Sequence, residues 1–356
     1  MKKFKNCLKN KAFNSENSKG RRYDSNDEDS PYFNCVNPFT LSRDKILNSK
    51  ARRRLDEKTQ VLCDPHNPHI RTRSRHTIEV VSIATKIADI TGLNIPLCEA
   101  IAEAHDIGHT PFGHLGEEFI SKMSGRKFSH EIFGIVISQH IERKGKGLNL
   151  NFEVLEGVLN HSRGGSALSI NPKNPLEYTV VMYADKIAYT FSDINDGLRY
   201  GHIEEAALPL EANHLGKNQR ERILYCIFTL IRESSEKGII SFSESEAAEK
   251  FGKIRNWMFE NYYSQIDWKI QKIILERVFE FLQRDPSFKG CDPSVLLALM
   301  TDAEINYMAK NIYLHGKKPR IEDIKNFGIM EIIPHIREKN IDFTDPDMDW
   351  DGQNKG

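Results

Sequence analysis

The sequence predicts an all-α protein, and three features of the chain support this. Apolar residues recur three and four positions apart in most segments, as on one face of a helix; Val80, Ile83 and Ile87 follow this spacing. Strand-like alternation of apolar and polar residues is short and isolated wherever it occurs. Glycine stands where periodic segments end, as at Gly92 and Gly197, which is typical of helix C-termini.

Composition limits the class of protein. The chain has 356 residues, 39% of them apolar, with 50 basic and 50 acidic side chains, so the net charge gives no bias toward nucleic acid or membrane. Six cysteines form no C-x-x-C pair, which is typical of reduced thiols and argues against a cysteine zinc site. No apolar run approaches the roughly 20 residues of a membrane span, and residues 1–14 lack the apolar segment of a secretory signal. We therefore expect a soluble, cytoplasmic protein.

Residues 1–30 are polar, and their first part is basic. Because such a segment buries little apolar surface, it cannot offset its ordering entropy. We expect a mobile arm here, with contact to nucleic acid or to a neighbouring subunit as the alternative. A helix over residues 42–62 follows, and its basic residues 52–54 and Lys58 are expected to form a solvated face. The next loop leads through Arg71 and Arg73 to His76, at the start of a helix over 77–91.

Residues 100–119 contain the densest group of chemically active side chains. His105 and Asp106 fall at the end of a predicted helix, which Gly108 and Pro111 then break. The same stretch also holds His109, His114, Glu117 and Glu118, with Gly113 and Gly116 keeping the turn between them tight. Imidazole and carboxylate groups bind divalent cations and transfer protons near neutral pH. A capped helix end would explain the His-Asp pair alone, but the whole stretch indicates part of a metal centre with a proton donor beside it.

Further helices are predicted over residues 115–123, 129–142, 152–160, 176–197, 217–237, 243–263, 266–284 and 295–309, with a loop over 162–175. Asp185 lies in an otherwise apolar part of the helix over 176–197 and begins the line Asp185, Tyr189, Asp193. Burying this carboxylate is costly unless it is paired or binds a metal, so Asp185 is the candidate ligand from outside residues 100–119. His130 and His161, taken alone, are interpreted as hydrogen-bonded structural histidines. Residues 342–356 are acidic and turn-rich, and we expect them to fray.

Five ordered blocks carry a resemblance to a known family. They read SRDKILNSKARRRLDEKTQV, RTRSRHTIEV, HDIGHTPFGHLGEE, LEGVLNHS and YADKIAYTFSDINDG. Together they resemble the HD-domain deoxynucleoside triphosphate triphosphohydrolases, or dGTPase family, over residues 38–200, with weaker likeness to residue 309. The resemblance implies a helical HD phosphohydrolase core over 31–205, a helical C-terminal part of the same catalytic unit over 206–316, and a partly frayed extension over 317–356.

The resemblance also implies a set of site residues. The metal ligands would be His76, His105, Asp106 and Asp185, a set that suits one divalent ion per site, either Mg, Mn, Fe, Ni or Zn. His114 would be the catalytic imidazole, oriented by Glu117. The substrate-binding residues would be Gln60 beside sugar and base, Arg73 and Lys186 on the phosphates, His109 and His130 in the phosphate channel, Tyr189 under the sugar, and Asp193 at the 3′-hydroxyl. Tyr263 lies in a loosely similar segment and matches a further sugar-contacting tyrosine.

Two positions depart from the family pattern. The segment FSHEIFG around His130 lacks a glutamine that relatives often place after the histidine, and Thr110 stands where proline is usual. Neither change removes a ligand.

The resemblance implies metal-dependent hydrolysis of deoxynucleoside triphosphates to deoxynucleoside and tripolyphosphate. The alternatives are another HD phosphohydrolase, acting on nucleoside monophosphates, cyclic nucleotides or guanosine polyphosphates, and a nucleic-acid-binding or nucleotide-sensing module. Besides the substrate, the expected partners are further copies of the chain and a nucleotide or nucleic-acid effector, without a membrane.

Overall fold

The fold is built from helices. The computed structural model describes residues 4–23, 35–63, 67–162, 173–315 and 321–349. Within these ranges the regular structure is helical apart from two isolated β-bridges, which confirms the all-α prediction. No helix in this part of the chain is both long and apolar enough to cross a lipid bilayer.

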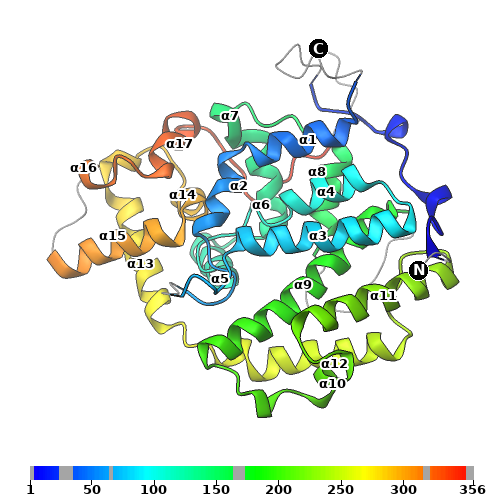
Figure 1. Cartoon of the computed structure of the whole chain (residues 1–356). Coiled ribbons are helices and arrows are strands. Elements are labelled where there is room, and N and C mark those ends of the chain that lie inside the picture. The colour runs from blue at the N-terminus through cyan, green and yellow to red at the C-terminus, as the bar shows by residue number, and fades with distance from the viewer. Residues whose placement is uncertain (1–3, 24–34, 64–66, 163–172, 316–320, 350–356) are drawn as a thin grey trace.

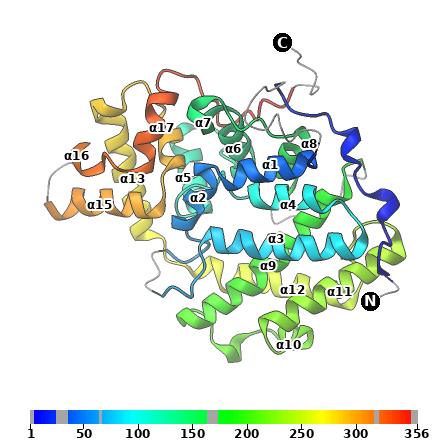
Figure 2. The ribbon, with the colours of Figure 1, turned by 45° about the horizontal axis from the view of Figure 1, so that its top comes forward.

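Three long helices form the centre of the molecule. α3 packs on both α4 and α9, and α1 covers the outer side of α4 (Figures 1 and 2). α9 carries an apolar stripe that is fully buried at Val180, Ala184, Ile187 and Phe191. The helices of this half are α1 (Pro38–Leu47), α2 (Lys50–Arg54), α3 (Arg73–Thr91), α4 (Ile95–Ala104), α5 (His114–Ser124), α6 (His130–Val136), α7 (Glu142–Gly145), α8 (Phe152–Asn160) and α9 (Leu176–Tyr200).

The C-terminal helices pack on two sides of this centre. α11 and α12 lie against α9, whereas α13 and α14 pack against α5 and α17 contacts α7 (Figure 1). The helices of this half are α10 (Leu210–Leu215), α11 (Gln219–Lys237), α12 (Glu246–Asn261), α13 (Lys269–Arg284), α14 (Pro293–Leu299), α15 (Asp302–His315), α16 (Ile321–Ile324) and α17 (Gly328–Ile336).

Over residues 4–23 the N-terminal segment differs from the mobile arm that we expected, and the rest of that prediction, residues 1–3 and 24–30, lies outside the described residues. Residues 4–23 lie on the core, with Leu8 buried. Asn6 and Leu8 donate backbone hydrogen bonds of 2.8 Å each to the carbonyls of Ile90 and Thr91 at the end of α3. Gly92, with φ +84°, allows this approach, because a Cβ there would lie 2.9 Å from Oδ1 of Asn6. Binding to an existing helix end compensates for the low apolar content, which the sequence pattern could not reveal.

The helix predicted over residues 42–62 is interrupted, and part of its predicted solvated basic face is buried. The helix breaks after α1, and Ser49 caps α2 by accepting from the Arg52 amide. Arg52 is buried and donates through Nε to Glu103 Oε2 at 2.8 Å. Lys58 is buried as well. The solvated-face prediction is therefore wrong for Arg52 and Lys58, because carboxylates and carbonyls from distant segments accept hydrogen bonds from them, whereas Arg53 is exposed.

Other boundaries shift for local reasons. The predicted helix over 129–142 becomes α6 followed by a π-helical turn, Ile137–Ile141, and the one over 295–309 divides into α14 and α15. α9 continues through Gly197 and ends at Gly201, which has φ +78°. The C-terminal segment was expected to fray from residue 342, yet Phe343 is fully buried and its ring packs on Phe128. The rest of that prediction, residues 350–356, lies outside the described residues.

Candidate active site

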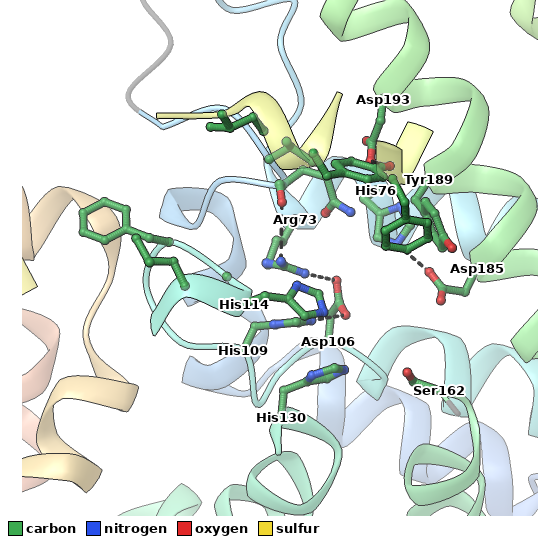
Figure 3. A pocket seen from close by; sticks show the side chains of 18 of the residues that line it. Arg73, His76, Asp106, His109, His114, His130, Ser162, Asp185, Tyr189 and Asp193 are labelled. Carbon is green, nitrogen blue, oxygen red and sulfur yellow. Dashed lines mark hydrogen bonds and ion pairs between the residues drawn. The ribbon is translucent and has the colours of Figure 1, made fainter. Parts of the chain in front are cut away.

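One cavity of about 540 Å³ collects most of the residues that the sequence singled out (Figure 3). Its walls come from α3, α5, α9 and α12, together with the loops that precede α3 and α5. Every predicted site residue lines this cavity except His105 and Glu117. These two contact lining residues instead: the ring of His105 packs against His76, and Glu117 pairs with His130. The residues that the resemblance selected come from four of the five blocks and, for His130, from outside them, yet they meet in one place.

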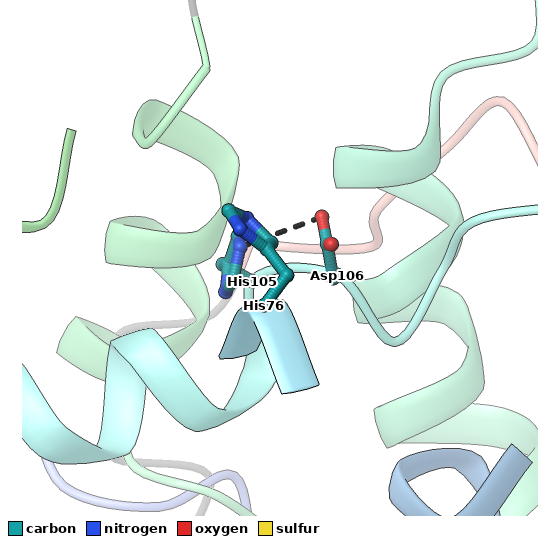
Figure 4. Close-up of side chains that lie close together, drawn as sticks. All are labelled: His76, His105 and Asp106. Atoms are coloured by element: carbon teal, nitrogen blue, oxygen red, sulfur yellow. Dashed lines mark ion pairs between the residues drawn. The ribbon is translucent and has the colours of Figure 1, made fainter. Parts of the chain in front are cut away.

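The four candidate metal ligands converge because α3 packs on α4 and α9. His76 lies in the first turn of α3, His105 and Asp106 directly follow α4, and Asp185 lies in the middle of α9. Nε2 of His76 lies 3.0 Å from Oδ1 of Asp185. Nε2 of His105 lies 3.5 Å from Oδ1 of Asp106 and 3.8 Å from Oδ1 of Asp185. Figure 4 shows the two imidazoles and Asp106 facing one another.

The chemistry of these donors fits a divalent cation. Nδ1 of His105 donates to the Ala102 carbonyl at 2.7 Å, so Nε2 is the unprotonated nitrogen. This Nε2 is buried, with no hydrogen-bond partner among the described residues, and such an orphaned acceptor costs about 1–3 kcal/mol. Ligand atoms of His76, His105 and Asp106 all lie within 4.8 Å of one another. A cation at this point would satisfy all of them.

The carboxylates remain ionised in spite of their burial. Desolvation alone would raise the pKa of Asp185, but the hydrogen bond and charge of His76 lower it below its usual range. Desolvation likewise acts to raise the pKa of Asp106, and His105, His109 and Arg73 together hold it well below its usual value. Two carboxylates are thus available to a cation at neutral pH.

This arrangement predicts that metal raises the thermal stability of the protein. Dialysis against a chelator should lower the unfolding temperature, and adding Mn²⁺, Mg²⁺ or Zn²⁺ separately should restore it with the ion that binds. Binding at one hundred times Kd stabilises the folded state by about 2.7 kcal/mol. Differential scanning calorimetry measures the shift. An unfolding temperature unaffected by every divalent ion would contradict the metal assignment.

A second group of side chains lies beside the metal ligands. Arg73 donates through NH1 to Oδ2 of Asp106 at 3.0 Å. The rings of His109 and His130 stack at 3.7 Å with an interplanar angle of 15°. Burial alone would lower the pKa of His130, but the Glu117 and Glu131 carboxylates raise it to about 9, so this imidazole is cationic at neutral pH.

Glu117 has different partners from the one we expected. Its Oε1 lies 3.0 Å from Nδ1 of His130 and 2.9 Å from Nδ1 of His109, and among the described residues it makes no hydrogen bond to His114. The stacked imidazoles present two nitrogens to the carboxylate at once, which a single ring could not do. In this structure Glu117 is hydrogen-bonded to His130 and lies beside His109, so its orientation of His114 stays a prediction.

His114 points into the cavity from the first turn of α5 (Figure 3). The turn before it has φ +58° at Phe112 and φ +57° at Gly113. A Cβ at Gly113 would lie 2.8 Å from Nη2 of Arg73, so the absence of a side chain leaves room for this guanidinium. Desolvation lowers the pKa of His114, and this effect outweighs the negative charge of Glu117, which acts to raise the pKa. The ring is therefore neutral at pH 7.

The outer part of α9 carries the remaining predicted residues. Tyr189 lies one turn after Asp185, and its hydroxyl accepts from Nε of Arg255 at 3.1 Å. Asp193 lies a turn further, and its Oδ2 accepts from the hydroxyl of Tyr263 at 2.7 Å. Burial raises the pKa of Asp193 to about 7. Tyr263, matched only loosely by sequence, is thus part of the same wall.

Several lining residues were missed by the sequence analysis. They are His161, Arg255, Phe259, Ile266, Trp268 and Lys272. The ring of His161 lies 5.2 Å from that of His105 and 5.5 Å from that of His130, but its block in the sequence suggested no role. The others lie on or between α12 and α13. Charged residues such as Arg255 and Lys272 on these helices normally indicate a solvated helix face, so they suggested no role in a site.

Comparisons with known proteins agree with this geometry. The HD domain family model matches residues 73–190. The deoxyguanosinetriphosphate triphosphohydrolase-like protein of Clostridium tetani is 39% identical over 276 residues, which are 75% of this chain and 78% of that protein. Proteins of the same name from Caldanaerobacter subterraneus and Neorickettsia sennetsu are 40% and 30% identical, over 68% and 76% of this chain and 71% and 84% of their own. The chain therefore belongs to the deoxyguanosinetriphosphate triphosphohydrolase-like family of HD-domain phosphohydrolases.

Proposed function

We propose that the protein hydrolyses deoxynucleoside triphosphates at the α-phosphorus, releasing a deoxynucleoside and tripolyphosphate. The observation that carries this proposal is the composition of one cavity. It brings three of the four convergent His and Asp side chains together with the cations of Arg73 and Lys186 and with Tyr189 and Asp193, and His105 lies against its wall through His76. The names of the relatives refer to the same class of reaction.

The phosphates would bind where the cations gather. Arg73 on α3 and Lys186 on α9 both line the cavity, and His130 adds a positive imidazole. Arginine and lysine side chains offset phosphate charge by charge-assisted hydrogen bonds. A divalent cation held by His76, His105, Asp106 and Asp185 would supply Lewis-acid chemistry at a phosphoryl oxygen.

The nucleoside would extend along α9 away from the metal ligands. Asp193 uses Oδ2 for Tyr263, which leaves its other oxygen to accept the 3′-hydroxyl. The ring of Tyr189 lies between Asp193 and Asp185 along the helix, so it would press against the C2′ edge of a sugar held between them. Phe259, Ile266 and Trp268 give the cavity an apolar part that suits a nucleobase.

Product analysis tests the proposed reaction. The purified protein is incubated with each deoxynucleoside and ribonucleoside triphosphate and with each divalent ion, and the phosphate product is identified by phosphorus NMR. Tripolyphosphate supports the proposal. Orthophosphate or pyrophosphate would indicate one of the other HD phosphohydrolases. Assembly into a homo-oligomer and regulation by a nucleotide or nucleic acid stay predictions.

Tyr189 is the residue that we propose excludes ribonucleotides. Replacing it with alanine should open space for a 2′-hydroxyl and narrow the preference for dGTP over GTP by at least about tenfold, the size of a small steric change in a binding pocket. Tyr189→Phe keeps the ring and should keep most of the preference. The measurement is kcat/KM for both nucleotides on both variants.

The control separates discrimination from stability. Tyr178 is a buried tyrosine of the same helix whose hydroxyl donates to Glu156 at 2.9 Å, outside the cavity. Tyr178→Ala should reduce stability without changing the dGTP to GTP ratio. An equal fall for both nucleotides in Tyr189→Ala would leave the steric role without support.

A further inference from the structure

Two loops of the site are bound to one carboxylate in the C-terminal half of the chain. Asp302, the first residue of α15, is buried. Its Oδ2 accepts from the backbone amide of Thr59 at 3.1 Å and from the Thr59 hydroxyl at 2.6 Å. Its Oδ1 accepts from the backbone amide of Phe112 at 3.1 Å. Thr59 precedes Gln60, and Phe112 lies two residues before His114.

We propose that Asp302 is a positioning residue, which fixes the loops carrying Gln60 and His114 in the geometry that receives the substrate. The proposal rests on the proposed function for its catalytic consequence, but the arrangement of the loops can be tested separately.

The bond to Phe112 holds an unfavourable backbone conformation. Phe112 has φ +58°, in the left-handed region that a residue with a bulky side chain rarely adopts. The turn is closed by the Gly113 amide, which donates to the Thr110 carbonyl at 3.2 Å. Without the carboxylate, the buried Phe112 amide would lose its acceptor, and the turn would relax toward an ordinary conformation. His114 would then leave its place in the cavity.

Asp302 is not needed to cap its own helix. Side chains at helix starts usually accept from amides in the first turn of the same helix, and here Thr301 does so by accepting from the Glu304 amide at 3.2 Å. The hydrogen bonds of the Asp302 carboxylate instead reach residues 190 and 243 positions earlier in the chain. A carboxylate placed only for helix stability would not require these partners.

Neighbouring contacts join the same elements. Nζ of Lys58 donates to the carbonyl of His109 and to that of Ala298, the latter at 3.2 Å. The Thr301 hydroxyl donates to Oε2 of Glu57 at 3.0 Å. The end of α14 and the start of α15 therefore contact both residues 57–59 and residues 109–112. Asp302 bonds to both of these segments.

The test compares two buried carboxylates. Asp302→Asn keeps the side-chain volume but replaces one acceptor oxygen with a donor amide, which cannot serve both loops. Glu233→Gln is the matched control, because the Glu233 carboxylate on α11 accepts from the Ser243 and Ser245 amides and from the Ser241 hydroxyl, away from the cavity. Hydrogen exchange of the segments 57–62 and 107–118, metal content, kcat and KM are measured on both variants.

In Asp302→Asn, the rate of hydrogen exchange in both segments should rise by about tenfold or more, because losing a local constraint makes local opening easier. The kcat should fall by about 10- to 100-fold, the effect of a small misplacement of reacting groups, while metal content stays at the wild-type level. Glu233→Gln should reduce thermal stability but leave these segments and kcat unchanged. Unchanged exchange in Asp302→Asn, or equal changes in both variants, would overturn the proposal.

A second pair of variants covers failure of Asp302→Asn to fold. Thr59→Val removes only the hydroxyl that donates to Asp302, and Thr59→Ser keeps it. Faster exchange over 107–118 in Thr59→Val but not in Thr59→Ser supports the shared constraint, and identical exchange in the two refutes it. If the wild-type protein releases no tripolyphosphate, the proposed function fails, whereas the exchange comparison still decides the role of Asp302.

Discussion

Asp185→Ala is expected to abolish metal binding and turnover while leaving the helical fold in place. Asp185 is the ligand that we propose α9 supplies, and its Oδ1 lies 3.0 Å from Nε2 of His76 and 3.8 Å from Nε2 of His105. Without it, two imidazoles and one carboxylate remain, which is one ligand fewer than the proposed set of four. We expect turnover to fall by more than about 10³-fold, or about 4 kcal/mol in the activation barrier. α9 keeps its apolar stripe, so its packing survives.

The control for this variant is a carboxylate on the same helix. Asp196 lies on α9 and pairs with Arg71, and its removal breaks an ion pair without touching the four proposed ligands. Elemental analysis of the purified proteins should find metal in Asp196→Ala and none in Asp185→Ala. Circular dichroism checks that both variants are folded. Unchanged metal content in Asp185→Ala would falsify the ligand assignment.

Three of the four proposed ligands could be suspected from the residues alone because each lies at a marked point of a regular element, whereas His76 was supplied only by the family resemblance. His105 and Asp106 follow the end of a helix that glycine and proline terminate, and Asp185 is an acid within an apolar run. Such positions are visible from spacing alone. The structure brings these side chains together through the packing of α3 on α4 and α9.

The partners of the charged groups could not be predicted in the same way. Arg52 and Lys58 looked like a solvated face, and only the distant Glu103 and Ala298 show why they are buried. Glu117 was assigned to His114, three residues away, but the stacked ring of His130 brought a better-placed nitrogen. Local sequence contains no information on these contacts, because each depends on where another segment packs.

Helix boundaries failed where tertiary contacts compete with helix propensity. A single helix was expected over 295–309, yet the chain breaks at Thr301, whose amide and hydroxyl both bond to Glu304. That break places Asp302 at the start of α15, in reach of Thr59 and Phe112. Apart from Tyr263, the residues that the C-terminal half contributes to the site were therefore missed by sequence reasoning.

His114→Ala is expected to keep the metal but to slow turnover by about 10²-fold or more, as removal of a proton-transferring group does. The ring lies in the cavity, outside the four ligands (Figure 3). It is neutral in the free protein, since desolvation lowers its pKa. A bound triphosphate would place negative charge beside the imidazole and raise its pKa, because opposite charges favour the protonated form. The protonated ring could then donate to the departing 5′-oxygen.

The His114 assignment depends on separating proton transfer from binding. His114→Gln keeps a hydrogen-bonding side chain but cannot transfer a proton at neutral pH, so it should be nearly as slow as His114→Ala in single-turnover measurements, with similar affinity for the nucleotide. Metal content should match the wild type in both variants. A variant that loses the metal yet keeps the normal rate per bound ion would show that His114 is a ligand and that the division of roles is wrong. A rate in His114→Gln close to that of the wild type would instead show that His114 acts only by hydrogen bonding. Glutamine can form a hydrogen bond but cannot transfer a proton, so a normal rate would mean that proton transfer is not required.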